Sequence, residues 1–139
     1  MSFAILGIDH VVLRVSDVER SIAFYCGVLG CTVERRLEDA GIYQLRAGRA
    51  LIDLVDVAAP LGRKGGPAPG PDGHNMDHFA LRIEPFDEAA IRAHLASHGI
   101  EAGKVATRYG AEGDGPSLYI EDPDGNTVEI KGPADRSAP

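Results

Sequence analysis

Two stretches of alternating hydrophobic and polar residues share one pattern, 68 positions apart. Residues 8–15 read Ile-Asp-His-Val-Val-Leu-Arg-Val, and residues 76–83 read Met-Asp-His-Phe-Ala-Leu-Arg-Ile. Alternation of this kind is typical of a strand with one buried face. His10 and His78 then begin the opposite face of their strands, together with the arginines of the two copies. The predicted buried faces carry Val11, Leu13 and Val15, and Phe79, Leu81 and Ile83.

A helical pattern follows each copy, with hydrophobic residues at intervals of three and four that form an apolar stripe. Ser16 is the predicted N-cap of the first helix, because Glu19 stands three residues later, as in a capping box. Gly30 is placed to end this helix. The second helix is predicted to begin near Asp87 and to stop at Gly99.

Short hydrophobic runs after each helix predict three strands in each half, at 31–37, 42–46 and 50–57 and at 100–106, 117–121 and 127–131. This order predicts an α+β fold of two tandem βαβββ modules. Residues 58–75 hold five glycines and four prolines and are predicted to be a linker without regular structure. A half of about 65 residues is marginally stable alone. We therefore expect a single domain over 1–139, with module one at 5–57 and module two at 76–132.

Carboxylates in the last strand of each half make the two histidines candidates for metal binding. Glu129 alternates with hydrophobic neighbours, and Asp53 occupies the matching place in Leu-Ile-Asp-Leu-Val. A carboxylate buried in a strand is unfavourable unless it is paired or ligated. Two histidines and one carboxylate suit first-row divalent metals. We predict that His10, His78 and Glu129 hold one divalent ion (Ni, Zn, Mn, Co or Fe), with Asp53 a fourth ligand or a hydrogen-bonded acid.

Other chemically capable residues favour a structural interpretation. His94 and His98 are four residues apart but lack the glutamate of a His-Glu-x-x-His motif, so they are predicted to be exposed helix residues. Cys26 and Cys31 are predicted to be reduced structural thiols, because no adjacent histidine or paired cysteine activates either one. The glycine-rich run 62–73 matches no nucleotide-binding motif.

Charge and hydropathy exclude several classes of partner. The net charge of −7 leaves no basic surface for a nucleic acid. No segment is long and apolar enough to span a membrane, and residues 1–10 lack the basic and apolar regions of a secretory signal. Two cysteines do not form a disulfide framework. We expect a cytoplasmic protein whose partner is a small-molecule substrate.

Three segments resemble the vicinal oxygen chelate superfamily, which includes glyoxalase I, extradiol dioxygenases, and fosfomycin- and bleomycin-resistance proteins. They are Asp-His-Val-Val-Leu-Arg-Val with the following Ser-Ile-Ala-Phe-Tyr, Met-Asp-His-Phe-Ala-Leu, and Leu-Tyr-Ile-Glu-Asp-Pro-Asp-Gly-Asn-Thr-Val-Glu at 118–129. The resemblance extends from about Ile8 to Lys131. It implies paired modules in an open, cup-shaped mixed sheet, and a homodimer.

The resemblance also implies roles for single positions. The predicted metal ligands match those of the family, and Asp53 matches the place of a fourth ligand in glyoxalase I. Arg14 matches an arginine that helps to hold glutathione, which implies substrate binding. Tyr119 matches a tyrosine that lines the site in fosfomycin-type proteins, which implies a role in catalysis or substrate binding. Glu129 and Asp53 are the candidates for a general base.

Departures from the family leave several reactions open. The glutathione-binding asparagine is absent after Asp53, and Val12 replaces a threonine of the fosfomycin transferases, although 111–115 resembles their potassium loop. Residues 110–112 lack the histidine of extradiol dioxygenases. The first hypothesis is a lyase or isomerase that acts on a small oxygenated metabolite through metal stabilisation of an enolate or oxyanion. The alternatives are an Fe(II)-dependent extradiol-type dioxygenase, a fosfomycin-type thiol transferase and a bleomycin-resistance-like binding protein.

Overall fold

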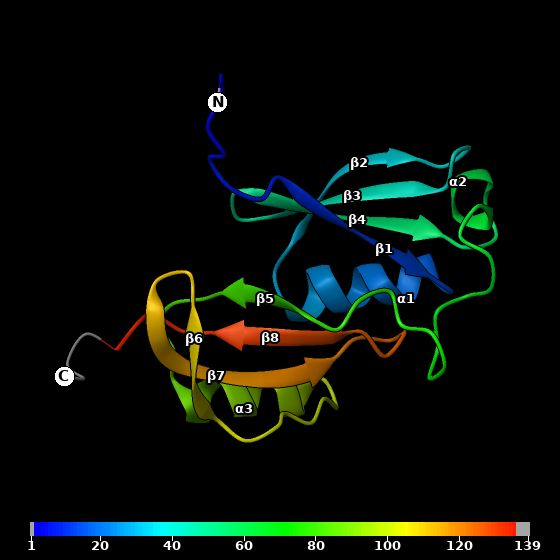
Figure 1. Cartoon of the computed structure of the whole chain (residues 1–139). Coiled ribbons are helices and arrows are strands. Elements are labelled where there is room, and N and C mark those ends of the chain that lie inside the picture. The colour runs from blue at the N-terminus through cyan, green and yellow to red at the C-terminus, as the bar shows by residue number, and fades with distance from the viewer. Residues whose placement is uncertain (1, 136–139) are drawn as a thin grey trace. The chain divides into compact units, whose positions relative to one another are not determined.

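Each half of the chain folds around a four-stranded sheet of its own in the computed structural model, which describes residues 2–135 (Figure 1). The chain consists of two compact units, Met1–Asn75 and Met76–Pro139. The strand order is β1-β4-β3-β2 in the first unit and β5-β8-β7-β6 in the second. In both units the first strand lies parallel to the last, and the other pairs are antiparallel. The predicted α+β fold of two tandem βαβββ modules is confirmed.

The first unit keeps the predicted alternation along its first strand, because Leu13 and Val15 are fully buried while His10 and Val12 are exposed. Tyr25, Leu45 and Leu54 are also fully buried and extend this core. The elements of the unit are β1 (His10–Val15), α1 (Val18–Ile22), the π-helix η1 (Ala23–Val28), β2 (Thr32–Leu37), β3 (Ile42–Ala47), β4 (Ala50–Asp56) and α2 (Pro60–Arg63).

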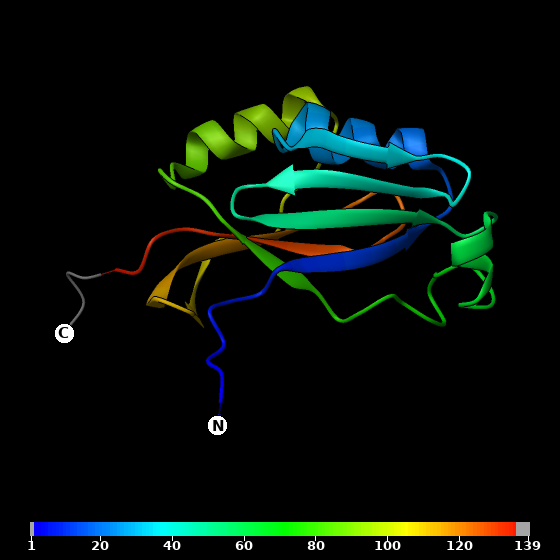
Figure 2. The ribbon, with the colours of Figure 1, turned by 90° about the horizontal axis from the view of Figure 1, so that it is seen from above.

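The second unit repeats this plan with a longer regular helix, which runs along one side of its sheet (Figures 1 and 2). Asp87 caps that helix, because its carboxylate accepts a hydrogen bond from the backbone N–H of Ala90 at 3.1 Å. Leu95 from the helix and Leu118, Ile120 and Val128 from the sheet are buried. The elements are β5 (Phe79–Arg82), α3 (Glu88–Ser97), β6 (Ala106–Gly110), β7 (Gly113–Glu121) and β8 (Thr127–Lys131).

The predicted cap of the first helix is wrong by one residue. Asp17, not Ser16, is the N-cap, and its carboxylate accepts from the backbone N–H of Arg20 at 3.1 Å. A carboxylate at this position satisfies a free N–H and also interacts favourably with the positive end of the helix, which a serine hydroxyl does less strongly. After Ile22 the helix continues as η1, and Gly30 follows with a φ of +83°.

Two further expectations need correction. The predicted strand at 100–106 does not form: β6 begins only at Ala106, and the carbonyls of Ala102 and Gly103 accept hydrogen bonds from Arg92 of α3. The linker 58–75 contains a short helix, α2 (Pro60–Arg63). Pro60 is its first residue, a position where the backbone N–H has no partner within the helix, so a proline is tolerated there. No helix within residues 2–135 is long and apolar enough to cross a membrane.

Candidate functional site

The two predicted histidines occupy equivalent places in the two sheets. His10 begins β1, and His78 directly precedes β5. Two residues further along, Val12 is in register with Asp53 of β4, and Ala80 is in register with Glu129 of β8. Each unit therefore presents one histidine and one strand carboxylate in the same relation, as the repeat predicts.

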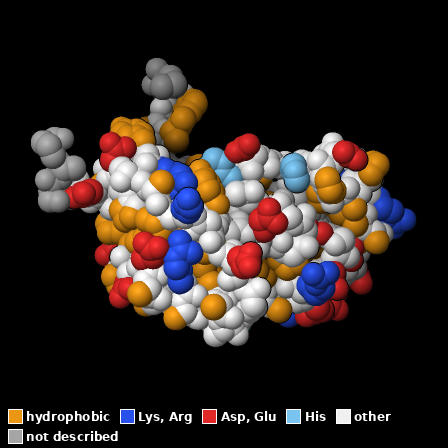
Figure 3. Space-filling view, turned by 90° about the horizontal axis from the view of Figure 1, so that it is seen from below, with side chains coloured by type: hydrophobic (Ala, Val, Ile, Leu, Met, Phe, Trp, Pro, Cys, Tyr) orange, Lys and Arg blue, Asp and Glu red, His pale blue; other side chains and the backbone are white. Residues whose placement is uncertain are grey.

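An aspartate immediately before each histidine fixes its ring. Nδ1 of His10 lies 2.7 Å from a carboxylate oxygen of Asp9, and Nδ1 of His78 lies 2.6 Å from Asp77. When Nδ1 donates its proton to a carboxylate, the lone pair of Nε2 is left for a ligand, as in carboxylate–histidine–metal arrangements. Both rings remain accessible, and histidine side chains are seen at the surface (Figure 3).

The hydrogen bond to Asp9 raises the pKa of His10 above its ordinary value, despite an opposing effect of desolvation. The negative charge of Asp53 raises the pKa of His10 further. His10 is therefore an imidazole surrounded by negative charge, and this environment favours a cation beside it.

Glu129 is buried, with 6% of its surface exposed, and Oε1 lies 3.4 Å from Nε2 of His78. The ring of Tyr119, in register with Glu129, packs edge-on against His78 with 5.5 Å between ring centroids. The guanidinium of Arg108 lies over the ring of Tyr119, 4.4 Å from its centroid. Three of the predicted site residues, His78, Tyr119 and Glu129, thus come together in the second unit.

The turn between β7 and β8 sets the position of Glu129. The buried Asp122 accepts hydrogen bonds from the backbone N–H groups of Asp124 and Asn126, at 2.9 and 2.8 Å, and from the amide of Asn126 at 2.8 Å. Gly125 supplies the positive φ of +80° that the turn requires. This turn is the Asp-Pro-Asp-Gly-Asn sequence that the family resemblance singled out.

Asp53 is more deeply buried, with 3% of its surface exposed. Its Oδ2 accepts from Nε2 of Gln44 at 3.3 Å, and its Oδ1 has no hydrogen-bond partner among the described residues. Gln44 was not identified from the sequence, although the tight β3–β4 hairpin places it in register with Asp53. A buried carboxylate oxygen without a partner is unfavourable, so it marks a position suited to a cation.

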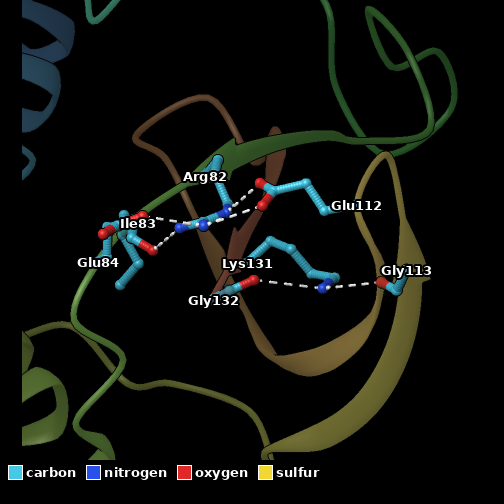
Figure 4. Close-up of polar contacts among 7 residues, drawn as sticks. All are labelled: Arg82, Ile83, Glu84, Glu112, Gly113, Lys131 and Gly132. Atoms are coloured by element: carbon cyan, nitrogen blue, oxygen red, sulfur yellow. Dashed lines mark hydrogen bonds and ion pairs between the residues drawn. The ribbon is translucent and has the colours of Figure 1, made fainter. Parts of the chain in front are cut away.

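A cavity of about 280 Å³ lies beside Glu129, entirely within the second unit. His78, Arg82, Glu112 and Lys131 are among its lining residues. Arg82 spans its edge through ion pairs with Glu112 at 2.6 Å and with Glu84 at 2.9 Å (Figure 4). Sequence reasoning did not identify Lys131, although it lies two residues after Glu129 and so on the same face of β8.

Arg14 is hydrogen-bonded to the segment that follows the first sheet. Its guanidinium donates to the carbonyls of Gly62, Gly66 and Pro67 at 2.6–3.2 Å. A Cβ atom at Gly65 would lie 2.3 Å from the guanidinium, so the glycine-rich sequence permits this close approach. The role of Arg14 in substrate binding stays a prediction.

The remaining candidates lie outside these groups. His94 and His98 are exposed on α3 with 5.0 Å between ring centroids, as predicted. Burial, with a smaller effect of Cys26, raises the pKa of Cys31 to about 11, so this thiol is protonated at neutral pH. That environment agrees with a structural thiol.

Within residues 2–135 no three histidine, cysteine, aspartate or glutamate side chains are gathered into a metal-binding group, but the types of donor present fit a divalent metal. The chain offers two imidazoles with accessible Nε2 atoms, one buried glutamate, and one buried aspartate oxygen without a partner. Imidazole and carboxylate donors together suit Zn, Ni, Co, Mn and Fe.

Comparison with known proteins gives consistent matches along the chain. The family model described as Glyoxalase/Bleomycin resistance protein/Dioxygenase superfamily matches residues 7–130. Virulence protein STM3117 of Salmonella typhimurium is 34% identical over 128 residues, which are 88% of this chain and 81% of that protein. Its crystal structure has a TM-score of 0.77 at 27% identity and covers 95% of this chain and 100% of its own.

Two enzymes are also similar in sequence. Lactoylglutathione lyase of Salmonella typhimurium is 31% identical over 124 residues, 87% of this chain and 88% of that enzyme. Catechol-2,3-dioxygenase of Bacillus subtilis is 28% identical over 131 residues, 94% of this chain. The chain spans only 42% of the length of the dioxygenase.

Proposed function

The chain belongs to the glyoxalase/bleomycin resistance protein/dioxygenase superfamily, and on that premise we propose that it is a metal-dependent lyase or isomerase of a small oxygenated metabolite. One observation carries the proposal. Each sheet presents a histidine, fixed at Nδ1 by the preceding aspartate, on the same side as a buried carboxylate of the partner strand. Two matched groups of this kind are better explained by a ligand set than by folding alone, because buried carboxylates destabilise unless they are compensated.

In the proposed site His10, His78 and Glu129 hold one divalent ion, and Asp53 is a further ligand or a supporting acid. When bound, such an ion polarises an oxygen of the substrate and stabilises the negative charge that develops on it. Because the ligands are divided between the two units, we propose that these units act together as one glyoxalase-like domain over 1–139.

The protein's own residues supply proton transfer and orientation. Glu129 and Asp53 are the proposed bases, because each is a buried carboxylate near a histidine, and a carboxylate can remove a proton next to a carbonyl group. Tyr119 packs against His78 and limits its rotation, and its hydroxyl is proposed to orient the substrate. Arg14 is proposed to bind substrate. To do so, its guanidinium would give up hydrogen bonds to backbone carbonyls and donate to a substrate group instead.

Metal binding tests the proposal directly. Metal-free protein is titrated calorimetrically with Ni(II) and Mn(II), and we expect one ion per chain. His10→Ala and His78→Ala should each lower the affinity by more than about 100-fold, since even groups that only support ligands contribute 10- to 100-fold. His94→Ala is the matched control and should bind as the wild type does. Equal binding by all three variants, or none by the wild type, would exclude this site.

The chemistry is then tested on the metal-loaded protein. The hemithioacetal of methylglyoxal and glutathione is the first substrate to examine, because lactoylglutathione lyase is similar over most of this chain. The second candidate function is Fe(II)-dependent ring cleavage, favoured by the similarity to catechol-2,3-dioxygenase. Oxygen uptake with catechol distinguishes the two, since isomerisation consumes no oxygen.

We also propose a cytoplasmic homodimer. Four large hydrophobic side chains before β1 are exposed, Phe3, Ile5, Leu6 and Ile8, at 69–99% of their surface. Exposed apolar clusters of this kind mark interaction surfaces. Light scattering should give the mass of two chains at micromolar concentration, and Leu6→Asp together with Ile8→Asp should give the mass of one.

A further inference from the structure

Lys131 is a buried cation whose charge the described residues do not neutralise. Only 7% of its surface is exposed. Its ammonium group makes two long contacts, 3.3 Å to the carbonyl of Gly132 and 3.5 Å to that of Gly113 (Figure 4). Among residues 2–135 no carboxylate pairs with it. A buried ammonium in this state is costly unless a counter-charge reaches it.

Two glycines leave room for the lysine side chain. A Cβ atom at Gly110 would lie 3.1 Å from Cε of Lys131, and a Cβ atom at Gly115 would lie 2.9 Å from Nζ. Any larger residue at either position would crowd the side chain. The β6–β7 hairpin therefore leaves a channel for this side chain, which gives the ammonium group a defined position.

Lys131 is also one of the residues that line the cavity beside His78 and Glu129. Glu129 and Lys131 are alternate residues of β8 and lie on one face of the sheet, where they are in register with Ala80 and Arg82. The cavity of about 280 Å³ lies just below the range for small-molecule sites, about 300–1,000 Å³. A cavity of this size suits a small metabolite.

The other charges of the cavity already have partners. Arg82 pairs with Glu112 through two nitrogens, at 2.6 and 3.2 Å, and also with Glu84. Glu129 faces His78 and belongs to the proposed metal ligands. Within residues 2–135 Lys131 is thus the charged side chain of this cavity that makes no ion pair, and an anionic ligand would supply one.

We propose that Lys131 binds an oxyanion of the substrate, so that the substrate is a small acid with a carboxylate or phosphoryl group beside a hydroxyl or carbonyl oxygen. The inference rests on the proposed function, which directs that neighbouring oxygen toward the metal ligands His78 and Glu129. The ammonium group selects for the acid, because a neutral analogue would leave the buried charge unpaired. Lys131 is then a residue that determines specificity, distinct from the metal ligands.

Three matched probes test the proposal on Ni(II)-loaded protein: glycolate, hydroxymethylphosphonate and the neutral glycolamide. All three carry the same hydroxyl group and differ in the group that would meet Lys131. We expect one or both anions to bind about 10- to 100-fold more tightly than glycolamide, the effect of one charge-assisted hydrogen bond. The tighter anion identifies the carboxylate or the phosphoryl source.

Lys131→Met, which keeps the length of the side chain and removes its charge, should abolish this preference. Lys104→Met, at an exposed lysine of the same unit, is the control and should retain it. Equal binding of the anions by Lys131→Met and wild type would overturn the proposal, as would a wild type that binds neither anion more tightly than glycolamide. The second comparison needs no variant and therefore does not depend on the folding of one.

The Ni(II) affinity of Lys131→Met separates this inference from the proposed function. We expect it to equal that of the wild type, because Lys131 is not a ligand. If the wild type binds no Ni(II), the proposed function fails, and thermal denaturation of the metal-free protein still tests Lys131. Glycolate or hydroxymethylphosphonate should then raise the Tm of the wild type more than that of Lys131→Met, and equal shifts of the two proteins with both anions would overturn the anion site by itself.

Discussion

In the first unit the strand carboxylate meets an amide, whereas in the second it meets an imidazole. Asp53 is bound by Gln44 and keeps one oxygen without a partner in the described chain, while Glu129 lies 3.4 Å from His78 and borders a cavity. The extra methylene of glutamate lets its carboxylate extend further from the strand than that of aspartate.

The positions next to the two carboxylates also differ, because those in the second unit carry more charge and line a cavity. Two residues beyond the carboxylate, the first unit has the buried Val55 and the second has Lys131. Arg14 is bound by backbone carbonyls of its own unit, whereas Arg82 is bound by carboxylates at the edge of a cavity. One strand topology therefore supports two environments, and the second unit carries most of the groups that could handle a substrate.

The largest expected effect compares the two carboxylates as metal ligands. Glu129→Gln should lower Ni(II) affinity by more than about 100-fold, whereas Asp53→Asn should lower it less than about tenfold if Asp53 only supports the site. Calorimetric titration of both variants measures the difference. Equal losses of Ni(II) affinity would show that Asp53 is a metal ligand as important as Glu129, and would contradict the difference between the units.

The two hairpin turns give the next contrast. Asp122→Ala removes three hydrogen bonds to a buried carboxylate and should lower the free energy of unfolding by about 3 kcal/mol. Gly48→Ala, in the β3–β4 turn at a φ of +61°, should lower it by about 1 kcal/mol, the effect of a side chain in left-handed backbone. Urea denaturation compares them, and a reversed order would show that the Asp122 turn is dispensable.

The strand partners of the carboxylates provide a smaller contrast. Gln44→Leu leaves both oxygens of Asp53 without a hydrogen bond and should destabilise the metal-free protein by about 1–2 kcal/mol. Tyr119→Phe keeps the ring against His78 and should change stability by less than about 0.5 kcal/mol. Thermal and urea unfolding at pH 7 measure both, and a large loss in Tyr119→Phe would assign a structural hydrogen bond to its hydroxyl group.

The smallest effect concerns the pH at which His10 titrates. Because the hydrogen bond to Asp9 raises the pKa of His10, the ring is protonated at higher pH than an ordinary histidine, and metal affinity should weaken as pH falls through that raised pKa. Asp9→Asn should shift the titration of His10 to lower pH. NMR titration of metal-free protein follows the ring directly. Asp72→Asn, at an exposed acid, is the control, and an identical shift in both variants would refute the local cause.

The frame of the site could be predicted from the sequence because strand alternation and the repeat are both local patterns. Placing His10 with His78, and Asp53 with Glu129, required only that the first and last strands of each half be adjacent, and the observed register agrees. Gln44 could also have been found, since the short turn at Gly48 and Arg49 fixes the β3–β4 register.

Other features depend on contacts between distant residues, which the alternation of hydrophobic and polar residues does not predict. Segment 100–105 does not pair as a regular strand: Arg92 binds the carbonyls of Ala102 and Gly103, and the N–H of Gly103 donates to the carbonyl of Tyr119. The burial of Lys131 depends on the absence of side chains at Gly110 and Gly115, which lie across the hairpin. Asp17 displaced Ser16 as a cap because two adjacent residues could both serve, and only the backbone geometry decides between them.

The parallel pairing of first and last strands has a consequence for the order of folding. Phe79 pairs with Val128, 49 residues later, whereas Glu121 and Thr127 pair across a single turn. Closing a long loop is entropically costly and slows folding, so the β7–β8 hairpin should form before β5 docks against it. Hydrogen exchange should therefore find the amides of β5 among the first to open. A ligand that binds both His78 and Glu129 would tie this late strand to its partner and protect those amides most.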